Sequence, residues 1–234
     1  MECEFHLCNC CKNQMCTNRI PLFSSLSDEE MDQIQSLIIQ RRYKKGETIL
    51  VPNEPMHCLF ILNSGVVKVT RDTNESKEQI LYLISENEFF GETNLFADIP
   101  SSMTAVALTD TVLCTVSKAH FQGLIMKYPM IALKVLEELS LRLNKMQQML
   151  ENSGGKSIDE RIVELLADFS NKYGTKNPQG IMIDLPLNRE EIANFLGLTR
   201  ETISRKLAKL HKEGHLKVIG HKKILLYDKK VSSI

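Results

Sequence analysis

The chain has 234 residues, of which 43% are hydrophobic and 25% charged, and its formal net charge is zero. This is the composition of a soluble globular protein, and the length allows two domains with a sizeable core. No apolar run approaches the roughly 20 residues of a membrane span, and no secretory signal opens the chain. We therefore exclude membrane and secreted proteins and predict a cytoplasmic one.

The seven cysteines are unevenly distributed. Five crowd the first sixteen residues and two lie further along, namely Cys3, Cys8, Cys10, Cys11, Cys16, Cys58 and Cys114. Because structural disulfides are rare in the cytosol, this number favours metal binding or redox chemistry over a disulfide scaffold. We treat residues 1–20 as a separate cysteine-rich segment.

A β-rich domain is predicted for residues 21–127. It opens with a helix that ends near Gln40, has Ser27 as its N-cap and has Glu30 in the matching position of a capping box. From there to about Val116 the pattern changes to short strands separated by turns. Strands at this spacing indicate an antiparallel β-barrel or β-roll.

A long helix is predicted from about Pro129 to Glu151, within a dimerisation segment at residues 128–152. Its apolar residues alternate spacings of four and three, as in the a and d positions of a coiled coil. These seam residues are Ala132, Leu136, Leu139, Leu143, Met146 and Leu150. A helix packed on its own β-domain is the alternative. We favour a homodimer, because the alternation is regular over about three repeats.

Residues 187–212 are typical of a helix-turn-helix. The first helix covers residues 189–195, Gly197 lies in a turn that favours positive φ, and Thr199 caps the second helix.

A winged domain at residues 153–234 surrounds this motif. We predict a hinge at residues 153–156, an amphipathic helix at residues 158–173, and a β-hairpin wing with strands at 216–218 and 224–226.

The second helix presents a polar side near its N-terminus. The DNA-contact residues predicted there are Thr199, Arg200, Glu201, Ser204 and Arg205. Arg pairs with guanine and Glu accepts from cytosine, so the two side chains together read a G·C base pair. A helical hairpin with a solvated charged face is the alternative. Two observations favour binding to double-stranded DNA. The motif carries a wing, and the chain from Pro186 onward has an excess of positive charge, with 11 Lys and Arg against 5 Asp and Glu.

No catalytic motif is visible in the sequence. It contains no nucleophile elbow, P-loop or Rossmann glycine pattern, and its six histidines are scattered. We therefore predict a regulator and not an enzyme.

The order of these segments resembles the CRP/FNR superfamily of bacterial transcription factors. Three motifs carry the resemblance, which covers residues 21–227: YKKGETIL with LNSGVVKV in the β-roll, FFGETNLF, and the RETISR helix. It implies an α+β fold with a β-roll similar to cyclic-nucleotide-binding domains, a long dimerisation helix and a C-terminal winged helix-turn-helix.

The cyclic-AMP branch of this superfamily binds its nucleotide on a GE-x-x-L-F segment followed by an Arg-Ser pair. Residues 91–96 match the first part, but residues 98–104 contain no Arg. A buried cyclic phosphate without a cation would be poorly compensated. The resemblance therefore implies no cyclic AMP, and leaves a non-nucleotide small molecule in the β-roll as one alternative effector.

The FNR branch binds an oxygen-labile [4Fe–4S] cluster through N-terminal cysteines and one β-roll cysteine. The resemblance implies that the ligands here are Cys8, Cys11, Cys16 and Cys114, with Cys10 as a spare. Four thiolates suit such a cluster. The interval from Cys11 to Cys16 differs by one residue from the best-known pattern. This reading predicts a regulator that responds to oxygen or redox state.

Two other uses of the cysteines stay open. Residues 16–23 also resemble a segment of Gram-positive FNR-like proteins in which one cysteine pairs reversibly with the β-roll cysteine, which implies a Cys16–Cys114 disulfide switch. Zinc held by four thiolates is the other.

The resemblance also bears on partners. The FNR branch reads TTGA-like half-sites through residues matching Glu201, Ser204 and Arg205, whereas the cyclic-AMP branch reads TGTGA-like half-sites with an Arg at the position of Arg200. The hairpin tip at residues 72–77 is either an RNA polymerase contact, as in the FNR branch, or a solvated turn.

Overall fold

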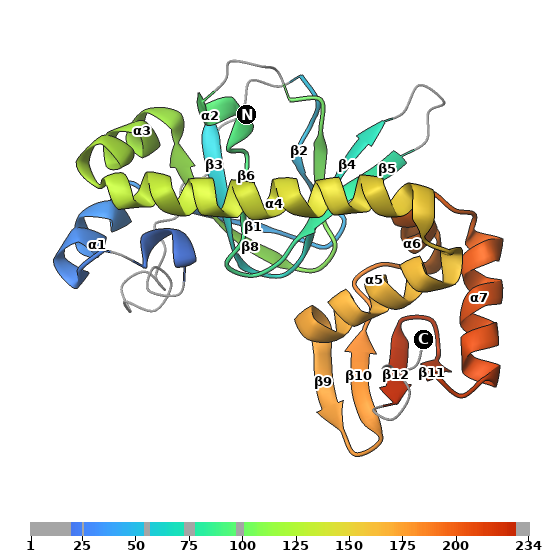
Figure 1. Cartoon of the computed structure of the whole chain (residues 1–234). Helices are drawn as coiled ribbons and strands as arrows, with labels where there is room; N and C mark the ends of the chain where they lie inside the picture. Colours follow the sequence, from blue (N-terminus) through green and yellow to red (C-terminus); the bar gives the residue numbers. More distant parts are fainter. Residues whose placement is uncertain (1–19, 25, 54–56, 73–77, 97–100, 228–234) are drawn as a thin grey trace. The chain divides into compact units, whose positions relative to one another are not determined.

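The computed structural model describes residues 20–24, 26–53, 57–72, 78–96 and 101–227 (Figure 1). Three of the predicted cluster ligands, Cys8, Cys11 and Cys16, lie outside these ranges, as do residues 73–77 of the predicted hairpin tip. The chain divides into two compact units. The first comprises Met1–Arg71 with Tyr82–Met146, and the second comprises Asp72–Leu81 with Gln147–Ile234.

The described part of the first unit opens with a 3-10 helix, η2 (Pro21–Phe23), and helix α1 (Asp28–Gln35). The predicted capping box is confirmed, because the Ser27 N–H donates to Glu30 Oε2 over 2.8 Å and the Glu30 N–H donates to Ser27 Oγ over 3.3 Å. The prediction that this helix reaches Gln40 is wrong. Ile39 already belongs to strand β1, since pairing with a distant strand overrides local helix propensity.

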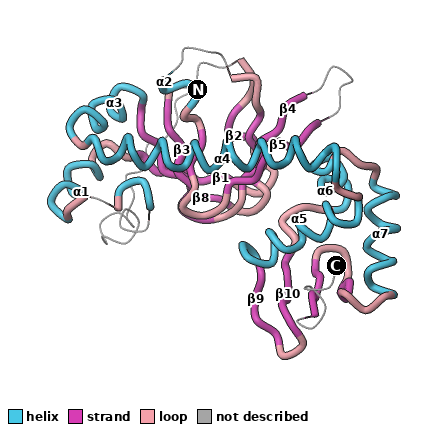
Figure 2. The backbone as a smooth tube through the Cα atoms, viewed as in Figure 1, coloured by secondary structure: helices cyan, strands magenta, loops and turns pink. Residues whose placement is uncertain are grey.

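Eight strands form the predicted antiparallel β-roll. They are β1 (Ile39–Tyr43), β2 (Thr48–Leu50), β3 (Cys58–Ser64), β4 (Val67–Asp72), β5 (Glu78–Ile84), β6 (Phe89–Phe90), β7 (Thr104–Ala107) and β8 (Thr111–Ser117). One sheet has the order β1-β8-β3-β6 and the other β2-β7-β4-β5, and Figure 2 shows their strands in magenta. Strand β8 pairs with both β1 and β3, which places its side chains in the interior of the unit.

Three helices complete the roll: α2 (Thr93–Phe96), α3 (Lys118–Lys127) and α4 (Pro129–Gly155). The first two were not predicted. Helix α4 runs beyond the predicted end at Glu151 and through most of the predicted hinge. Helix extension adds one hydrogen bond per residue fixed, which offsets the roughly 1 kcal/mol that each glycine costs in a helix.

The second unit contains the predicted winged helix-turn-helix. Its elements are α5 (Ile158–Tyr173), β9 (Gly174–Asn177), β10 (Gly180–Asp184), α6 (Arg189–Leu196), α7 (Arg200–Lys212), β11 (Leu216–Ile219) and β12 (Lys223–Tyr227). The wing strands β11 and β12 are confirmed, but they join an unpredicted hairpin in a sheet of order β11-β12-β10-β9. Gly180 permits this junction, because a Cβ there would lie 1.9 Å from the Leu226 carbonyl oxygen.

No helix within the described ranges is long and apolar enough to cross a membrane.

Candidate DNA interface and sensor region

The turn between α6 and α7 has the predicted geometry. Gly197 adopts φ 64° and ψ 38°, in the left-handed region that glycine enters without strain. Thr199 caps α7, since its hydroxyl accepts from the Thr202 N–H over 3.2 Å. Local capping and turn chemistry therefore orient the two helices, and the corresponding predictions are confirmed.

Helix α7 has a buried side and an exposed side. Ile203, Leu207 and Leu210 are buried against the rest of the unit. Of the predicted contact residues, Thr199, Arg200, Glu201 and Arg205 are exposed and Ser204 is partly exposed. The structure thus brings these residues together near the N-terminus of one helix, where a recognition helix meets base edges.

The wing is tied to the C-terminal end of α7. His211 Nδ1 accepts a hydrogen bond from the Val218 N–H over 3.1 Å, and strand β11 begins at Leu216. Because Nδ1 accepts this bond, the imidazole is held in one orientation between α7 and β11. This hydrogen bond therefore connects the wing to α7.

Residues 91–96, which resemble part of a nucleotide-binding motif, contribute Glu92 to a buried ion pair. Arg142 Nη1, from α4, lies 2.8 Å from Glu92 Oε1, and Arg142 Nη2 donates to the Phe89 carbonyl over 2.9 Å. Their side chains are only 19% and 10% exposed. Sequence reasoning missed this contact, because the two partners lie 50 residues apart in the chain.

Two aromatic rings enclose the Arg142 guanidinium. Its carbon lies 5.3 Å from the centroid of Tyr82 and 5.6 Å from that of Phe89, within cation–π range. Burial and the nearby Glu92 carboxylate raise the pKa of Tyr82 to about 12, so this phenol is neutral at physiological pH. The Arg142 guanidinium is therefore held both by hydrogen bonds and by two aromatic rings.

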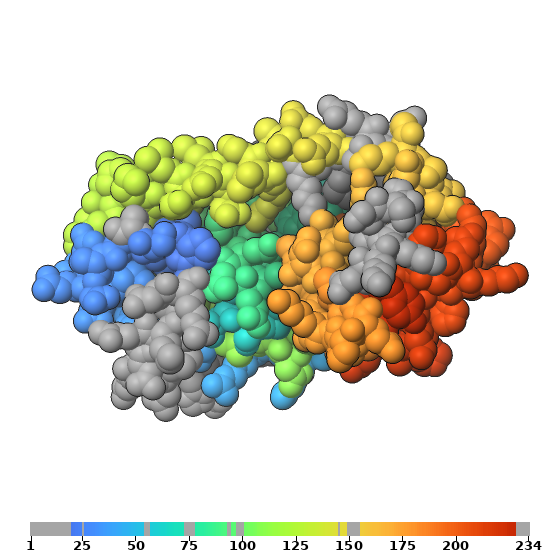
Figure 3. All heavy atoms as spheres, turned by 60° about the horizontal axis from the view of Figure 1, so that its bottom comes forward, coloured from blue at the N-terminus to red at the C-terminus, as the bar shows by residue number. Residues whose placement is uncertain are grey.

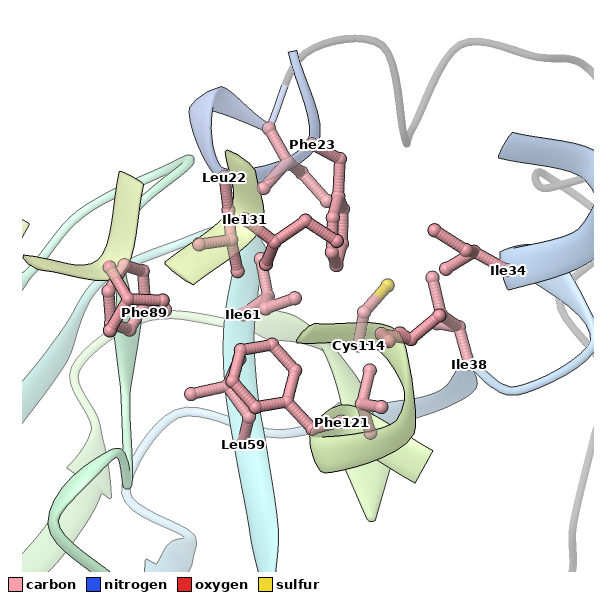
Figure 4. Close-up of a cluster of buried hydrophobic side chains, with 14 of the residues drawn as sticks. Leu22, Phe23, Ile34, Ile38, Leu59, Ile61, Phe89, Cys114, Phe121 and Ile131 are labelled. Carbon is pink, nitrogen blue, oxygen red and sulfur yellow. The ribbon is translucent and has the colours of Figure 1, made fainter. Parts of the chain in front are cut away.

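Cys114 is the one predicted cluster ligand within the described ranges. It lies on β8, is 2% exposed, and belongs to a core cluster with Ile20, Leu22 and Phe23. Figure 4 shows its sulfur among the side chains of Phe23, Ile34 and Ile38. Neither Cys114 nor Cys58 forms a disulfide with a described residue. The described residues hold no group of three or more potential metal-ligating side chains.

The predicted dimer seam lies on α4 beside the face that packs on the roll. Ile131 and Val135 are buried in the same core cluster as Cys114, and Leu139 packs against it. Leu136 and Leu143 are each 58% exposed and Met146 is 41% exposed. Figure 3 shows α4 in yellow-green and yellow along the surface of the molecule. Ala132 is partly exposed, and the Leu150 side chain lies outside the described set.

The two halves of the chain match two family models. Residues 40–128 match the model described as a cyclic nucleotide-binding domain, and residues 160–230 match the Crp-like helix-turn-helix domain. The chain is also 31% identical over 189 residues to the Global nitrogen regulator of Synechococcus elongatus, covering 80% of this chain and 85% of that protein. The chain belongs to the CRP/FNR family. It is therefore a DNA-binding transcription regulator of the CRP/FNR type.

Other CRP/FNR proteins match over most of the chain. The Electron transport regulator A of Shewanella oneidensis is 28% identical over 227 residues, 97% of this chain and 88% of that protein. A mutant of CooA from Carboxydothermus hydrogenoformans has a TM-score of 0.73 at 27% identity, covering 88% of this chain and 91% of that one. The c-di-GMP responsive regulator CLP of Xanthomonas campestris has a TM-score of 0.74 at 26% identity. The match covers 84% of this chain and 97% of that one.

Proposed function

We propose that this CRP/FNR regulator senses oxygen or redox state through a [4Fe–4S] cluster held by Cys8, Cys11, Cys16 and Cys114. The observation that carries the proposal is the packing of Cys114 against the segment Ile20–Phe23. Cys16 precedes Ile20 by four residues, and four residues of extended chain reach about 14 Å. A chain link of this length is compatible with Cys16 and Cys114 binding one cluster.

The chemistry of the donors fits this group. Cysteine thiolates are the common ligands of [4Fe–4S] clusters, and four are available. The apolar side chains around Cys114 exclude water from its sulfur, and burial is one of the factors that set cluster properties. When bound, the cluster supplies an oxygen-labile redox centre.

The core cluster around Cys114 also reaches the dimer helix. It contains Ile131 and Val135 of α4, so Cys114 and α4 share one packed interior. Close-packed interiors transmit small displacements, because side chains have few voids into which to relax. A change in what Cys114 binds is thus expected to alter how α4 packs on the roll, and through α4 the separation of the two recognition helices of a homodimer.

Cysteine variants test the ligand set. Cys114→Ser and Cys16→Ser are expected to lose most of the iron that the anaerobically purified wild-type protein contains, because each removes one of four thiolates. Cys58→Ser is the matched control, since Cys58 is partly buried on β3 and belongs to none of the proposed schemes. Iron analysis of the three variants is the measurement. Equal iron in Cys58→Ser and Cys114→Ser would contradict the assignment.

The Cys16–Cys114 disulfide switch predicts a different outcome. It requires Cα atoms about 4.4–6.8 Å apart and no iron. Mass mapping of the air-oxidised protein would then find a peptide linking these two cysteines, and Cys8→Ser with Cys11→Ser would leave the redox response intact. The cluster proposal predicts loss of the response in these variants.

A regulator gated by a small molecule in the β-roll is the second candidate. Oε2 of the buried Glu92 makes no hydrogen bond to any described residue, so it is a free acceptor for a hydroxyl or amine. Arg142 already binds the other oxygen of this carboxylate, and no arginine follows in residues 97–104. We therefore expect cyclic AMP and c-di-GMP to leave the melting temperature unchanged. A rise with either would favour a nucleotide effector over a non-nucleotide one.

DNA reading by α7 is tested with Arg205. Arg205→Ala is expected to weaken binding to the preferred palindrome by about 1–3 kcal/mol and to relax selection at one base pair, because a bidentate contact to guanine is lost. The measurement compares the selected palindrome with a scrambled duplex by fluorescence anisotropy. Lys212→Ala, at the far end of the same helix, is the control. Equal losses by Arg205→Ala on both duplexes would argue against base reading.

A further inference from the structure

The first turn of α5 holds both helices of the helix-turn-helix. Asp159 Oδ1 lies 2.6 Å from Lys206 Nζ, and Asp159 Oδ2 lies 3.4 Å from Lys209 Nζ. Two residues further on, the Arg161 guanidinium donates to the Leu196 carbonyl at the end of α6. A single helical turn thus contacts the recognition helix and the turn that precedes it.

Asp159 is ionised in this arrangement. The hydrogen bond from Lys206 holds the pKa of Asp159 below its usual value, and Lys209 acts in the same direction. The Asp159 and Lys206 side chains are 30% and 24% exposed, so this contact is partly desolvated. Lys209 is 55% exposed and also lies 3.8 Å from Glu213. Acidic side chains therefore engage both ammonium groups.

The two lysines lie on a flank of α7. Residues three apart on a helix are neighbours, so Lys206 and Lys209 share one side. That side lies between the buried side chains Ile203, Leu207 and Leu210 and the exposed Arg205. A recognition helix in the major groove runs between two phosphate backbones, and basic side chains on its flanks are the ones placed to contact phosphates.

We propose that Asp159 is a specificity-determining residue, which keeps Lys206 and Lys209 off the DNA phosphates while it fixes α7 against α5. Phosphate contacts raise affinity for every sequence alike, whereas base contacts distinguish sequences. Keeping two lysine side chains away from the DNA phosphates therefore lowers the affinity for non-specific DNA. The choice between DNA sequences is then made by the N-terminal residues of α7, which contact the bases. The inference rests on the proposed DNA reading by α7 and is independent of the sensor chemistry.

Salt titration on non-specific DNA tests the proposal. The full-length Asp159→Asn protein is expected to bind a scrambled duplex about tenfold more tightly at low salt than the wild type. The slope of log affinity against log salt should steepen by about 4 for a dimer in which each chain gains two phosphate contacts. The ratio of affinities for the selected palindrome and the scrambled duplex should fall. An unchanged or shallower slope would overturn the proposal.

Asp159→Asn both releases the lysines and changes the net charge of the protein. Further variants distinguish these two causes of a steeper slope. Asp168→Asn removes the same charge from the exposed side of α5 and should leave the slope unchanged. Lys206→Gln with Lys209→Gln should reverse the steepening when both are combined with Asp159→Asn. The same steepening from Asp168→Asn, or no reversal by the two lysine substitutions, would refute the role of Asp159.

A variant that keeps Asp159 covers the case in which Asp159→Asn fails to fold. Lys206→Gln with Lys209→Gln should leave the slope on scrambled DNA at its wild-type value, because neither lysine contacts a phosphate in the proposed arrangement. A shallower slope would show that the lysines already contact phosphates, and the proposal would be wrong.

Discussion

Arg142→Ala is expected to lower the free energy of unfolding of the first unit by about 3–5 kcal/mol. The substitution leaves the Glu92 carboxylate buried without its cation and the Phe89 carbonyl without its donor. Removing one partner of a buried ion pair is far more destabilising than removing the pair, because an uncompensated charge remains. Urea denaturation followed by circular dichroism measures the change.

Two controls separate the charge from the packing of the Arg142 side chain. Lys134→Ala removes a solvent-exposed pair with Glu137 on the same helix, and should change stability by about 0–1 kcal/mol. Arg142→Leu combined with Glu92→Leu should recover most of the loss, because apolar replacements of both partners leave no buried charge. A loss below about 1 kcal/mol for Arg142→Ala would mean that the pair does not secure α4 to the roll.

Leu143→Glu is expected to raise the dissociation constant of the homodimer at least about a hundredfold. A buried leucine contributes roughly 1.5–3 kcal/mol, and each dimer loses two of them. The introduced carboxylates would also face each other across the seam. Sedimentation equilibrium of the anaerobic protein measures the effect, and affinity for the palindrome should fall with it.

Leu141→Glu is the matched control for the seam. Leu141 is 59% exposed, nearly the same as the 58% of Leu143, but it lies two residues away on another side of α4. The seam predicts that Leu141→Glu stays dimeric. Monomers in both variants, or in neither, would show that the a and d positions do not form the interface.

The features predictable from sequence are those with local causes. The capping box at Ser27, the left-handed Gly197 and the Thr199 cap each depend on residues within three or four positions. The wing followed from two short apolar runs next to a glycine. These signals identify the helix-turn-helix and place the recognition residues on one helix.

The features that sequence reasoning missed depend on partners far apart in the chain. The end of α1 is decided by the pairing of Ile39 with Thr115, and the β9–β10 hairpin is completed by β12. The pairs Glu92–Arg142 and Asp159–Lys206 join residues some 50 positions apart. The sequence does not reveal which of many distant charged residues will lie next to a given one. These ion pairs could therefore be identified only from the three-dimensional structure.

Iron and acid-labile sulfide analysis of the anaerobically purified wild-type protein is the direct test of the proposed cluster. We expect about four irons and four sulfides per chain, with a broad visible absorption band that disappears in air. A colourless protein without iron, which nevertheless binds its palindrome, would argue against the cluster and leave the Cys16–Cys114 disulfide or a small-molecule effector in its place.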